Sequence, residues 1–494
     1  MTRRLHPAIW IFVLCLICLF TISNINQPAE TFKPFTPQLV QPQYQNKQLW
    51  STHLGLRIAD LRAKIPTIDR LVLVPDRATF LAAIEQWSLK GRWPILIEDK
   101  QYTPMFIRRF HPSQVIRLPA VAKPLPMDQL RQRLQEATAM AWSPNKRESL
   151  SQTWKRLGWQ TPGVVVTWES DPAWPAAVSL AADRGQPLVF LDADFGAPNG
   201  TLNPAQWQML QNNVQQAVEQ TGYAYAGLGD EIDTVTIVRQ LAAKYQHTEK
   251  AQEQLAVTDG LARHPDGQRW AIVGWIYGSS ERALFQAMCS IFLPQDTALL
   301  YNSYPKDGVW GQYTMAQTAH QLSKVGFDVK HIQRPQAGIR NWRDLTKGGL
   351  NFDLIFVNTK GASSDFDLGD GTASVEDIPT LDIPAAVHFI HSWSAVTPDD
   401  PKTVAGRWLE HGAYAYVGSV DEPYLQAFVT PQLLVKRLQI LTPFLIAARQ
   451  IQAPPWKITT IGDPLMTILK FPPSLDTSQS SNQGTSARKQ SGHT

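Results

Sequence analysis

The sequence repeats one order of apolar and polar segments at an interval of 93 residues. Residues 71–99 contain an apolar run, a helix-like segment, a turn with glycine, and a second apolar run that ends in aspartate. Residues 164–192 repeat this order without a gap, so that Val72 corresponds to Val165. A strand, a helix and a second strand in this order form a βαβ unit, in which the two strands are parallel. The repeat therefore predicts an α/β protein with an internal duplication.

Strand-like and helix-like segments continue to alternate after both copies. Each copy extends into a helix-like segment and a short apolar run, at residues 114–118 and 223–229, and a helix over residues 127–140 connects the copies. In the second half, the predicted strands are 270–278, 297–305, 328–332, 352–358, 385–391 and 413–420, and the predicted helices are 280–293, 314–327, 341–350, 403–412 and 431–450. Alternation at this spacing is typical of a mostly parallel sheet that is covered on both faces. The predicted fold class is α/β, with two Rossmann-like three-layer regions.

Chain length and turn-rich stretches divide the sequence into regions. A chain of 494 residues is long enough for two or three hydrophobic cores. The predicted regions are a signal anchor or signal peptide (1–30), a linker (31–53), the duplicated α/β domain (54–246), a second linker (247–268), a second α/β domain (269–472) and a disordered tail (473–494). The tail is rich in Ser, Gln and Gly, and it has too few apolar residues to form a core.

The first 30 residues indicate a membrane-targeting segment. Arg3 and Arg4 precede the apolar run 9–21, and the next charged residue is Glu30. This order is typical of a secretory signal peptide or a short membrane anchor. We favour an uncleaved single-pass anchor in the inner membrane with its basic end in the cytoplasm, following the positive-inside tendency. The body of the protein is then extracytoplasmic, either periplasmic or at the cell surface.

Charge and cysteine content argue against some functions. The chain has 46 basic and 42 acidic residues without a basic stripe, which argues against a nucleic-acid partner. Cys15 and Cys18 lie in the N-terminal apolar run, and the third cysteine, Cys289, lies in the body. Cys289 belongs to an apolar, helix-like segment, so we expect a buried packing role for it and not a nucleophilic one.

Three segments of the second α/β region resemble a known peptidase family. They are GRWLEHGA (406–413), GAYAYVGSVDEP (412–423) and GDP (462–464). Together with the order of the elements, they resemble the caspase-like fold, and more closely its gingipain-type cysteine peptidases, over about residues 268–470. The resemblance implies a His-Gly pair after one strand and a Cys after the next, which act as base and thiolate nucleophile.

Neither catalytic position carries the residue that this resemblance implies. The strand at 352–358 is followed by Thr359-Lys360-Gly361, and the next strand ends in His391-Ser392-Trp393. Lys360 therefore replaces the histidine, and no cysteine follows the second strand. The resemblance thus implies a degenerate peptidase domain, for which we predict no catalytic residues.

The carboxyl ends of these strands are the expected place for a ligand, because ligands bind there in open α/β sheets. The candidate ligand cleft consists of Lys360, His391, Ser392, Asp421 and Glu422. An alternative hypothesis is a hydrolase with Ser392 as nucleophile and His388 or His391 as base. Successive residues of a strand point to opposite sides, so His391 and Ser392 meet only if the backbone turns there.

An acidic, glycine-rich loop at residues 363–379 is a candidate metal site. Asp365, Asp367 and Asp370 partly follow the spacing of a calcium loop, and Ca²⁺ is therefore one hypothesis for a ligand. The alternative is a solvated loop without a metal, because Asp370 stands where a calcium loop has glycine. Nothing else in the sequence indicates a cofactor.

The strand–helix–strand pattern of residues 70–245 resembles the bacterial cell-wall-binding repeat of the second type. That family attaches proteins to envelope polymers, so the resemblance implies a cell-wall polymer or an envelope protein as partner. Together these features predict a membrane-anchored, extracytoplasmic protein with a degenerate gingipain-like domain that acts in envelope binding or scaffolding. The alternative is a hydrolase or peptidase whose active site has been rewired at the strand ends.

Overall fold

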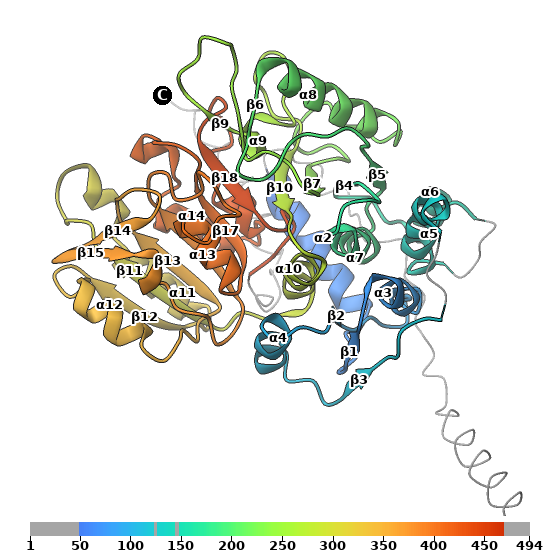
Figure 1. The fold of residues 1–494 in the computed structure, drawn as a ribbon, viewed down its shortest axis with the longest axis horizontal. Helices are drawn as coiled ribbons and strands as arrows, with labels where there is room; N and C mark the ends of the chain where they lie inside the picture. The colour runs from blue at the N-terminus through green and yellow to red at the C-terminus, as the bar shows by residue number, and fades with distance from the viewer. Residues whose placement is uncertain (1–48, 123–125, 144–147, 469–494) are drawn as a thin grey trace, which may run out of the picture.

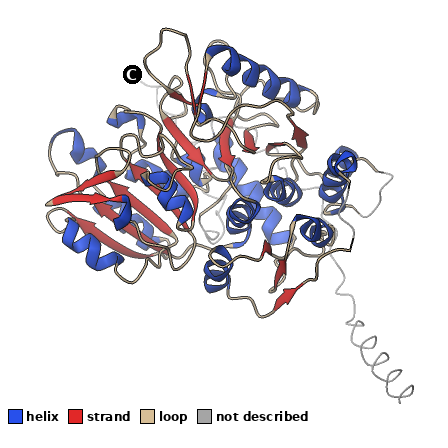
Figure 2. Cartoon of the chain, viewed as in Figure 1, coloured by secondary structure: helices blue, strands red, loops and turns tan. Residues whose placement is uncertain are grey.

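A ten-stranded sheet forms the centre of the molecule (Figures 1 and 2). The computed structural model describes residues 49–122, 126–143 and 148–468. In spatial order the strands of the sheet are β12 (Asp328–Gln333), β11 (Thr297–Asn302), β13 (Leu354–Asn358), β16 (Ala385–Ile390), β17 (Ala413–Ser419), β18 (Ile458–Ile461), β10 (Ile272–Ile276), β7 (Thr234–Val238), β4 (Gly163–Thr167) and β5 (Leu188–Phe190). Neighbouring strands are parallel except β17 and β18, which are antiparallel. The predicted α/β fold with a mostly parallel sheet is confirmed.

The strands of this sheet change direction once, between β17 and β18. As a result, the carboxyl ends of β11, β13, β16 and β17 share one rim of the sheet with the amino ends of β18, β10, β7 and β4. The carboxyl ends of β10, β7 and β4 lie on the opposite rim.

Helices cover both faces of the sheet, as Figure 2 shows. The hydrophobic core of one face includes α7 (Trp174–Arg184), α10 (Ser280–Phe292), α11 (Ala316–Lys324), α14 (Pro431–Gln439) and α15 (Phe444–Ala447). The core of the other face includes α8 (Pro204–Glu219), α12 (Ile339–Thr346) and α13 (Val404–Glu410). Because both faces are buried, central strands such as β13 and β16 are continuous buried runs without polar alternation.

A separate three-stranded parallel sheet precedes the large one in the chain. Its spatial order is β2 (Ile95–Ile97), β1 (Leu71–Val74) and β3 (Val115–Arg117), and its strands are connected by α3 (Arg77–Ile84) and α4 (Tyr102–Phe110). Val72 pairs with Ile95 in this sheet, and 93 residues further on Val165 pairs with Leu188 in the large sheet. The two βαβ units therefore share one register although they belong to different sheets. The helices α5 (Met127–Met140) and α6 (Leu150–Leu157) lie between them in the chain.

Some predicted elements differ from the observed ones. Residues 223–229 contain no strand, and the third strand of the second unit is β7, a buried, largely β-branched run that pairs with β4. The predicted helix 431–450 is two helices, α14 and α15, because Leu441 adopts a φ of 65° and Pro443 cannot donate a helical hydrogen bond.

The segment 247–268, for which we predict a linker, contains β9 (Leu255–Ala256) and α9 (Val257–Gly260). β9 pairs with β8 (Lys244–Tyr245), which also pairs with β6 (Thr201–Leu202). The ten-stranded sheet contains strands from both sides of this segment, so the two predicted α/β regions are joined by the pairing of β7 with β10.

The first described helix, α2 (Trp50–Lys64), lies against the body of the protein. Leu54 packs into a small core with Ile272 of β10. Gly55 faces the carbonyl oxygen of Leu441 so closely that a Cβ atom at this position would lie 1.7 Å from that oxygen. The chain therefore enters the structure through a helix that is packed tightly against the loop after α14.

Both predicted terminal segments, the anchor at 1–30 and the tail at 473–494, lie outside the described residues. Within the described ranges, no helix combines the length and the apolar character that a membrane span requires.

Candidate functional site

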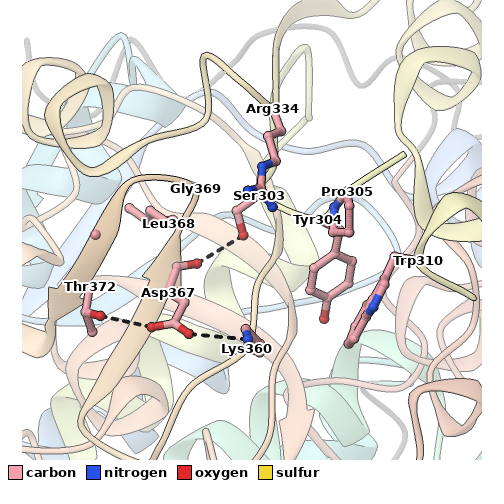
Figure 3. A pocket seen from close by; sticks show the side chains of 11 residues that line it. Ser303, Tyr304, Pro305, Trp310, Arg334, Lys360, Asp367, Leu368, Gly369 and Thr372 are labelled. Carbon is pink, nitrogen blue, oxygen red and sulfur yellow. Dashed lines mark hydrogen bonds and ion pairs between the residues drawn. The ribbon is translucent and has the colours of Figure 1, made fainter. Parts of the chain in front are cut away.

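A cavity of about 390 Å³ opens at the carboxyl ends of β11, β12 and β13 (Figure 3). It is lined by residues that follow these three strands and by part of the hairpin of β14 (Asp365–Leu368) and β15 (Gly371–Ser374). Its charged and aromatic members are Tyr304, Trp310, Arg334, Lys360 and Asp367. We call it the strand-end cavity. Lys360, which belongs to the predicted ligand cleft, is part of it.

The strand-end cavity carries two positive side chains and one negative side chain. Lys360 Nζ lies 3.9 Å from Asp367 Oδ2, and the Thr372 hydroxyl donates a hydrogen bond to Asp367 Oδ1 at 2.9 Å (Figure 3). The Lys360 side chain is 70% exposed, so the pair is solvated and contributes little to stability. Arg334 adds the second positive charge, and the cavity therefore has a cationic surplus.

Tyr304 and Trp310 form an aromatic wall of this cavity (Figure 3). Their ring centroids are 4.4 Å apart. The Tyr304 hydroxyl donates a hydrogen bond to the carbonyl oxygen of Thr359 at 2.6 Å, which holds the ring in place. A cationic surplus next to an aromatic wall suits an anionic ligand that also carries an apolar or planar group.

His391 lies at the end of β16, but its imidazole is buried. The residue is 1% exposed, and its Nε2 lies 2.9 Å from the carbonyl oxygen of Asp365. Burial lowers the pKa of His391 to about 4, so the ring is neutral at pH 7. Within the described ranges, no hydrogen bond joins the hydroxyl of Ser392 to His391 or to His388. A serine nucleophile needs such a base, and Ser392 lacks one.

Gly361 makes room for this arrangement. A Cβ atom at position 361 would lie 2.5 Å from the carbonyl oxygen of Asp365 and 2.7 Å from His391 Nε2. The glycine after Lys360 therefore allows the β14 backbone and the imidazole to approach each other.

His388 and Cys289 are the other side chains with catalytic potential, and both are fully buried. His388 lies between the rings of Phe356 and Phe428, at centroid distances of 5.6 and 6.3 Å, and burial lowers its pKa to about 3. Cys289 on α10 is the one cysteine among the described residues; it is 0% exposed, and burial raises the pKa of its thiol. Neither residue can reach a ligand at the strand ends.

Asp421 and Glu422 follow β17, and neither lines the strand-end cavity. Asp421 Oδ1 accepts a hydrogen bond from Trp393 Nε1 at 3.1 Å, and Asp421 Oδ2 lies 3.6 Å from Lys457 Nζ. Lys457 also donates to the carbonyl oxygen of Glu422 at 3.0 Å. Burial lowers the pKa of Lys244, and the charge of Asp421 opposes this shift. These contacts connect β17 to β18, which indicates a structural role.

The acidic loop forms a hairpin of β14 (Asp365–Leu368) and β15 (Gly371–Ser374). Its three candidate metal ligands have separate partners: Asp365 accepts from Ala362 N at 3.2 Å, Asp367 pairs with Lys360, and Asp370 accepts from Ile339 N at 2.6 Å at the start of α12. Among the residues that the structure describes, no group of three His, Cys, Asp or Glu side chains could hold a metal ion. The fold thus uses these carboxylates to stabilise the hairpin and α12.

Three of the residues that shape the strand-end cavity were not predicted from the sequence. Arg334 follows the predicted strand 328–332, so the strand-end rule that identified Lys360 would have identified it too. Tyr304 lies inside the predicted strand 297–305, and it reaches the cavity because the observed strand β11 already ends at Asn302. Trp310 lies in the short 3₁₀ helix Gly308–Tyr313, and no pattern in the sequence places this loop beside β13.

Comparison with solved structures finds a partial likeness to two proteases. The Arg-specific cysteine proteinase gingipain R superposes with a TM-score of 0.42 and 14% sequence identity, over 62% of this chain and 78% of that chain. A second structure, described as a protease, superposes with a TM-score of 0.41 and 12% identity, over 63% of this chain and 79% of that chain. No protein-family model matches the sequence, and no curated protein is significantly similar to it. Function is therefore inferred from the residues of this chain.

Proposed function

We propose that this protein is a membrane-anchored, extracytoplasmic binding protein without peptidase activity, and that its strand-end cavity holds an anionic polymer or protein of the cell envelope. The main support for this proposal is the set of residues that lie at the strand ends. Lys360 and Arg334 lie there beside an aromatic wall, while His388, His391 and Cys289 are buried.

The chemistry of the strand-end cavity favours binding over catalysis. Lys360 is exposed and lies 3.9 Å from the carboxylate of Asp367, so it can offer its side-chain nitrogen to an anionic ligand. General acid–base catalysis would need a group whose pKa lies near the working pH and which reaches the substrate. The imidazole of His391 is held on a backbone oxygen and is neutral over the physiological range.

The membrane location in this proposal is supported by the sequence. Two arginines followed by the apolar run 9–21 resemble a signal anchor, and the helix α2 then connects residue 50 to the body. In this arrangement the strand-end cavity faces the compartment outside the inner membrane.

Retention on isolated cell envelope tests the binding function. The full chain, purified in detergent, is expected to co-sediment with envelope fragments, and Lys360→Glu combined with Arg334→Glu is expected to reduce the retained fraction at least fivefold. Lys324→Glu, an exposed lysine on α11, is the matched control and is expected to leave retention unchanged. Equal retention of the double variant and the control would contradict the proposed site.

A protease assay tests the absence of catalysis. The full chain is expected to leave a fluorescent casein substrate intact, with and without a thiol reductant. Cleavage that disappears in Ser392→Ala and persists in Ser394→Ala would instead establish the rewired hydrolase.

A further inference from the structure

A second cavity, of about 480 Å³, lies between α8 and the segment 260–267. We call it the α8 cavity. Among the described residues it shares no lining residue with the strand-end cavity, and the helix that lines it, α8, is labelled in Figure 1. Its volume lies in the range of about 300–1,000 Å³ that is usual for small-molecule sites.

One wall of the α8 cavity is a row of amide side chains. Gln208, Gln211, Asn212 and Gln215 are spaced three and four residues apart, so they lie on one face of the helix. Gln208 Nε2 donates to Asn212 Oδ1 at 2.8 Å, and Gln215 Nε2 donates to Glu219 Oε1 at 3.0 Å. Because an amide has two donor hydrogens and an acceptor oxygen, each of the four side chains keeps hydrogen-bonding capacity for a ligand. A row of four such groups matches a ligand with several hydroxyl groups, because each hydroxyl also donates and accepts.

The floor of the α8 cavity is aromatic. Trp207 and Tyr245 are stacked with their ring centroids 3.7 Å apart and an angle of 14° between their planes. Trp270 is the third aromatic residue that lines the cavity. The three rings are 4%, 1% and 2% exposed, so only small parts of them reach the cavity, where they give it an apolar floor next to the polar amides.

The wall opposite α8 contains the buried Arg263, whose side chain is 4% exposed. Its Nε donates to the carbonyl oxygen of Asp259 at 2.8 Å, and its Nη1 donates to that of Gly267 at 2.7 Å. Its Nη2 has no hydrogen-bond partner among the described residues and lies 3.9 Å from Asp259 Oδ1. Arg263 therefore has hydrogen-bonding capacity that the protein itself does not use.

The charge around Arg263 is not balanced. The single carboxylate of Asp259 is shared by Arg263, Arg269 and Arg449, all of them buried. Burial, and then the repulsion of Arg269, lower the pKa of Arg263 to about 10, so the guanidinium still carries its proton at neutral pH. Buried charge without a counter-charge is unfavourable, and an anion in the adjoining cavity would offset it.

The remaining titratable groups at the cavity are Asp266, His247 and His264. Asp266 is exposed and accepts a hydrogen bond from Gln268 N at 2.9 Å, within its own turn. His264 Nε2 lies 2.9 Å from the carbonyl oxygen of Ala226. Among the described residues, Asp266 is thus the one acid that lines the cavity, and it lies at the exposed turn whereas the guanidinium of Arg263 is buried.

We propose that the α8 cavity binds an acidic saccharide, with the sugar hydroxyls on the amide row, the ring on the aromatic floor and the carboxylate towards Arg263. The ligand class follows from the combination of amides, aromatic surface and surplus buried positive charge in one cavity. The inference concerns a second site and stands independently of the strand-end cavity.

Calorimetric titration of the full chain in detergent tests the proposal, with D-glucuronate as the probe and D-glucose as its uncharged counterpart. Glucuronate is expected to bind at least about tenfold more tightly than glucose, a difference of roughly 1.4 kcal/mol. Equal affinities for the two sugars, or no saturable heat with glucuronate at millimolar concentration, would overturn the proposal.

A charge variant on α8 locates the binding. Gln211→Glu places a negative charge in the amide row and is expected to weaken glucuronate binding about tenfold by repulsion, with less than a twofold effect on glucose. Gln211 makes no side-chain hydrogen bond within the described structure, so the variant is expected to fold. Gln216→Glu adds the same charge to the same helix outside the cavity and is expected to change neither affinity. A loss of the same size in both variants would show that the helix charge, and not the cavity, governs binding.

Discussion

Burial separates the residues that a ligand can reach from those that it cannot reach. His388, His391 and Cys289 are all 1% exposed or less, and all have pKa values that burial has shifted towards the neutral form. Lys360, in contrast, extends into solvent. A sequence identifies residue types at strand ends, but the depth of each side chain depends on the helices and loops that pack over the strand.

The buried His388 is expected to make the folded protein less stable as the pH falls. Its pKa is about 3 in the folded protein and about 6.5 in an unfolded chain, so the unfolded state binds the extra proton as pH falls below 6.5. The free energy of unfolding therefore decreases from pH 6.5 towards pH 4. His388→Leu is expected to reduce this slope by up to about 1.4 kcal/mol per pH unit, as measured by urea unfolding across that range.

The same variant is expected to stabilise the protein at pH 7. Neither ring nitrogen of His388 has a hydrogen-bond partner in the described structure, and leucine of similar size removes this penalty of about 1–3 kcal/mol. His320→Leu, at an exposed position on α11, is the control for loss of a histidine and is expected to retain the slope. An unchanged slope in His388→Leu would show that this histidine is not the buried acid-sensitive group.

Individual elements show where sequence patterns succeed and where they fail. Val72 pairs with Ile95, and the residues 93 positions further on, Val165 and Leu188, pair in the same way. The sequence predicts this match because strand register follows the apolar pattern of each strand. The apolar run 223–229 fails as a strand, since the β-branched residues of β7 fill the neighbouring position in the sheet. The candidate ligand cleft was predicted only in part, because its residues do not all lie in one place. Lys360 lines the strand-end cavity, whereas His391 contacts the carbonyl oxygen of Asp365 and Asp421 contacts Trp393.

The helix α2 provides a prediction in which packing opposes propensity. Alanine is about 1 kcal/mol better than glycine inside a helix, so propensity alone predicts that Gly55→Ala stabilises the protein. The carbonyl oxygen of Leu441 occupies the space of the added methyl group, so we expect the variant to lower the free energy of unfolding by about 1–3 kcal/mol. Chemical denaturation of the full chain measures this difference.

Ala63→Gly is the companion variant for α2. Ala63 is exposed in the last turn of the helix, so this change is expected to cost about 0.5–1 kcal/mol through propensity alone. If Gly55→Ala proved stabilising, α2 would not be packed against Leu441 in solution.

The whole molecule is organised by the continuous sheet. β18 lies between β17 and β10, and one hydrophobic core includes residues from the N-terminal sheet as well as from the large sheet. A chain cut at the predicted boundary would expose the edge of β10, which pairs with β7 along five residues. The alternation of strand-like and helix-like segments could not predict that the two halves share one sheet. It gives the order of the strands along the chain, but not which strands pair with each other.

Expression of residues 269–472 alone tests this continuity. The fragment is expected to lack a cooperative unfolding transition and to bind a hydrophobic dye, because both the β10 edge and its covering core would be exposed. Residues 49–472 are expected to unfold with coincident changes in tryptophan fluorescence and far-ultraviolet circular dichroism. A fragment 269–472 with its own sharp transition would establish an autonomous C-terminal domain.

The single change of strand direction at β17 and β18 has a consequence for multivalent binding. It brings the carboxyl ends of β11 and β13 to the same rim as the amino ends of β7 and β10, and Trp270 of the α8 cavity lies just before β10. A linear polyanion that is bound in the strand-end cavity and is long enough to follow this rim would reach the α8 cavity while it stays bound. Its second contact would then form at an effective concentration of up to about millimolar, so two weak sites on one chain could give high avidity for a polymer and low affinity for its single units.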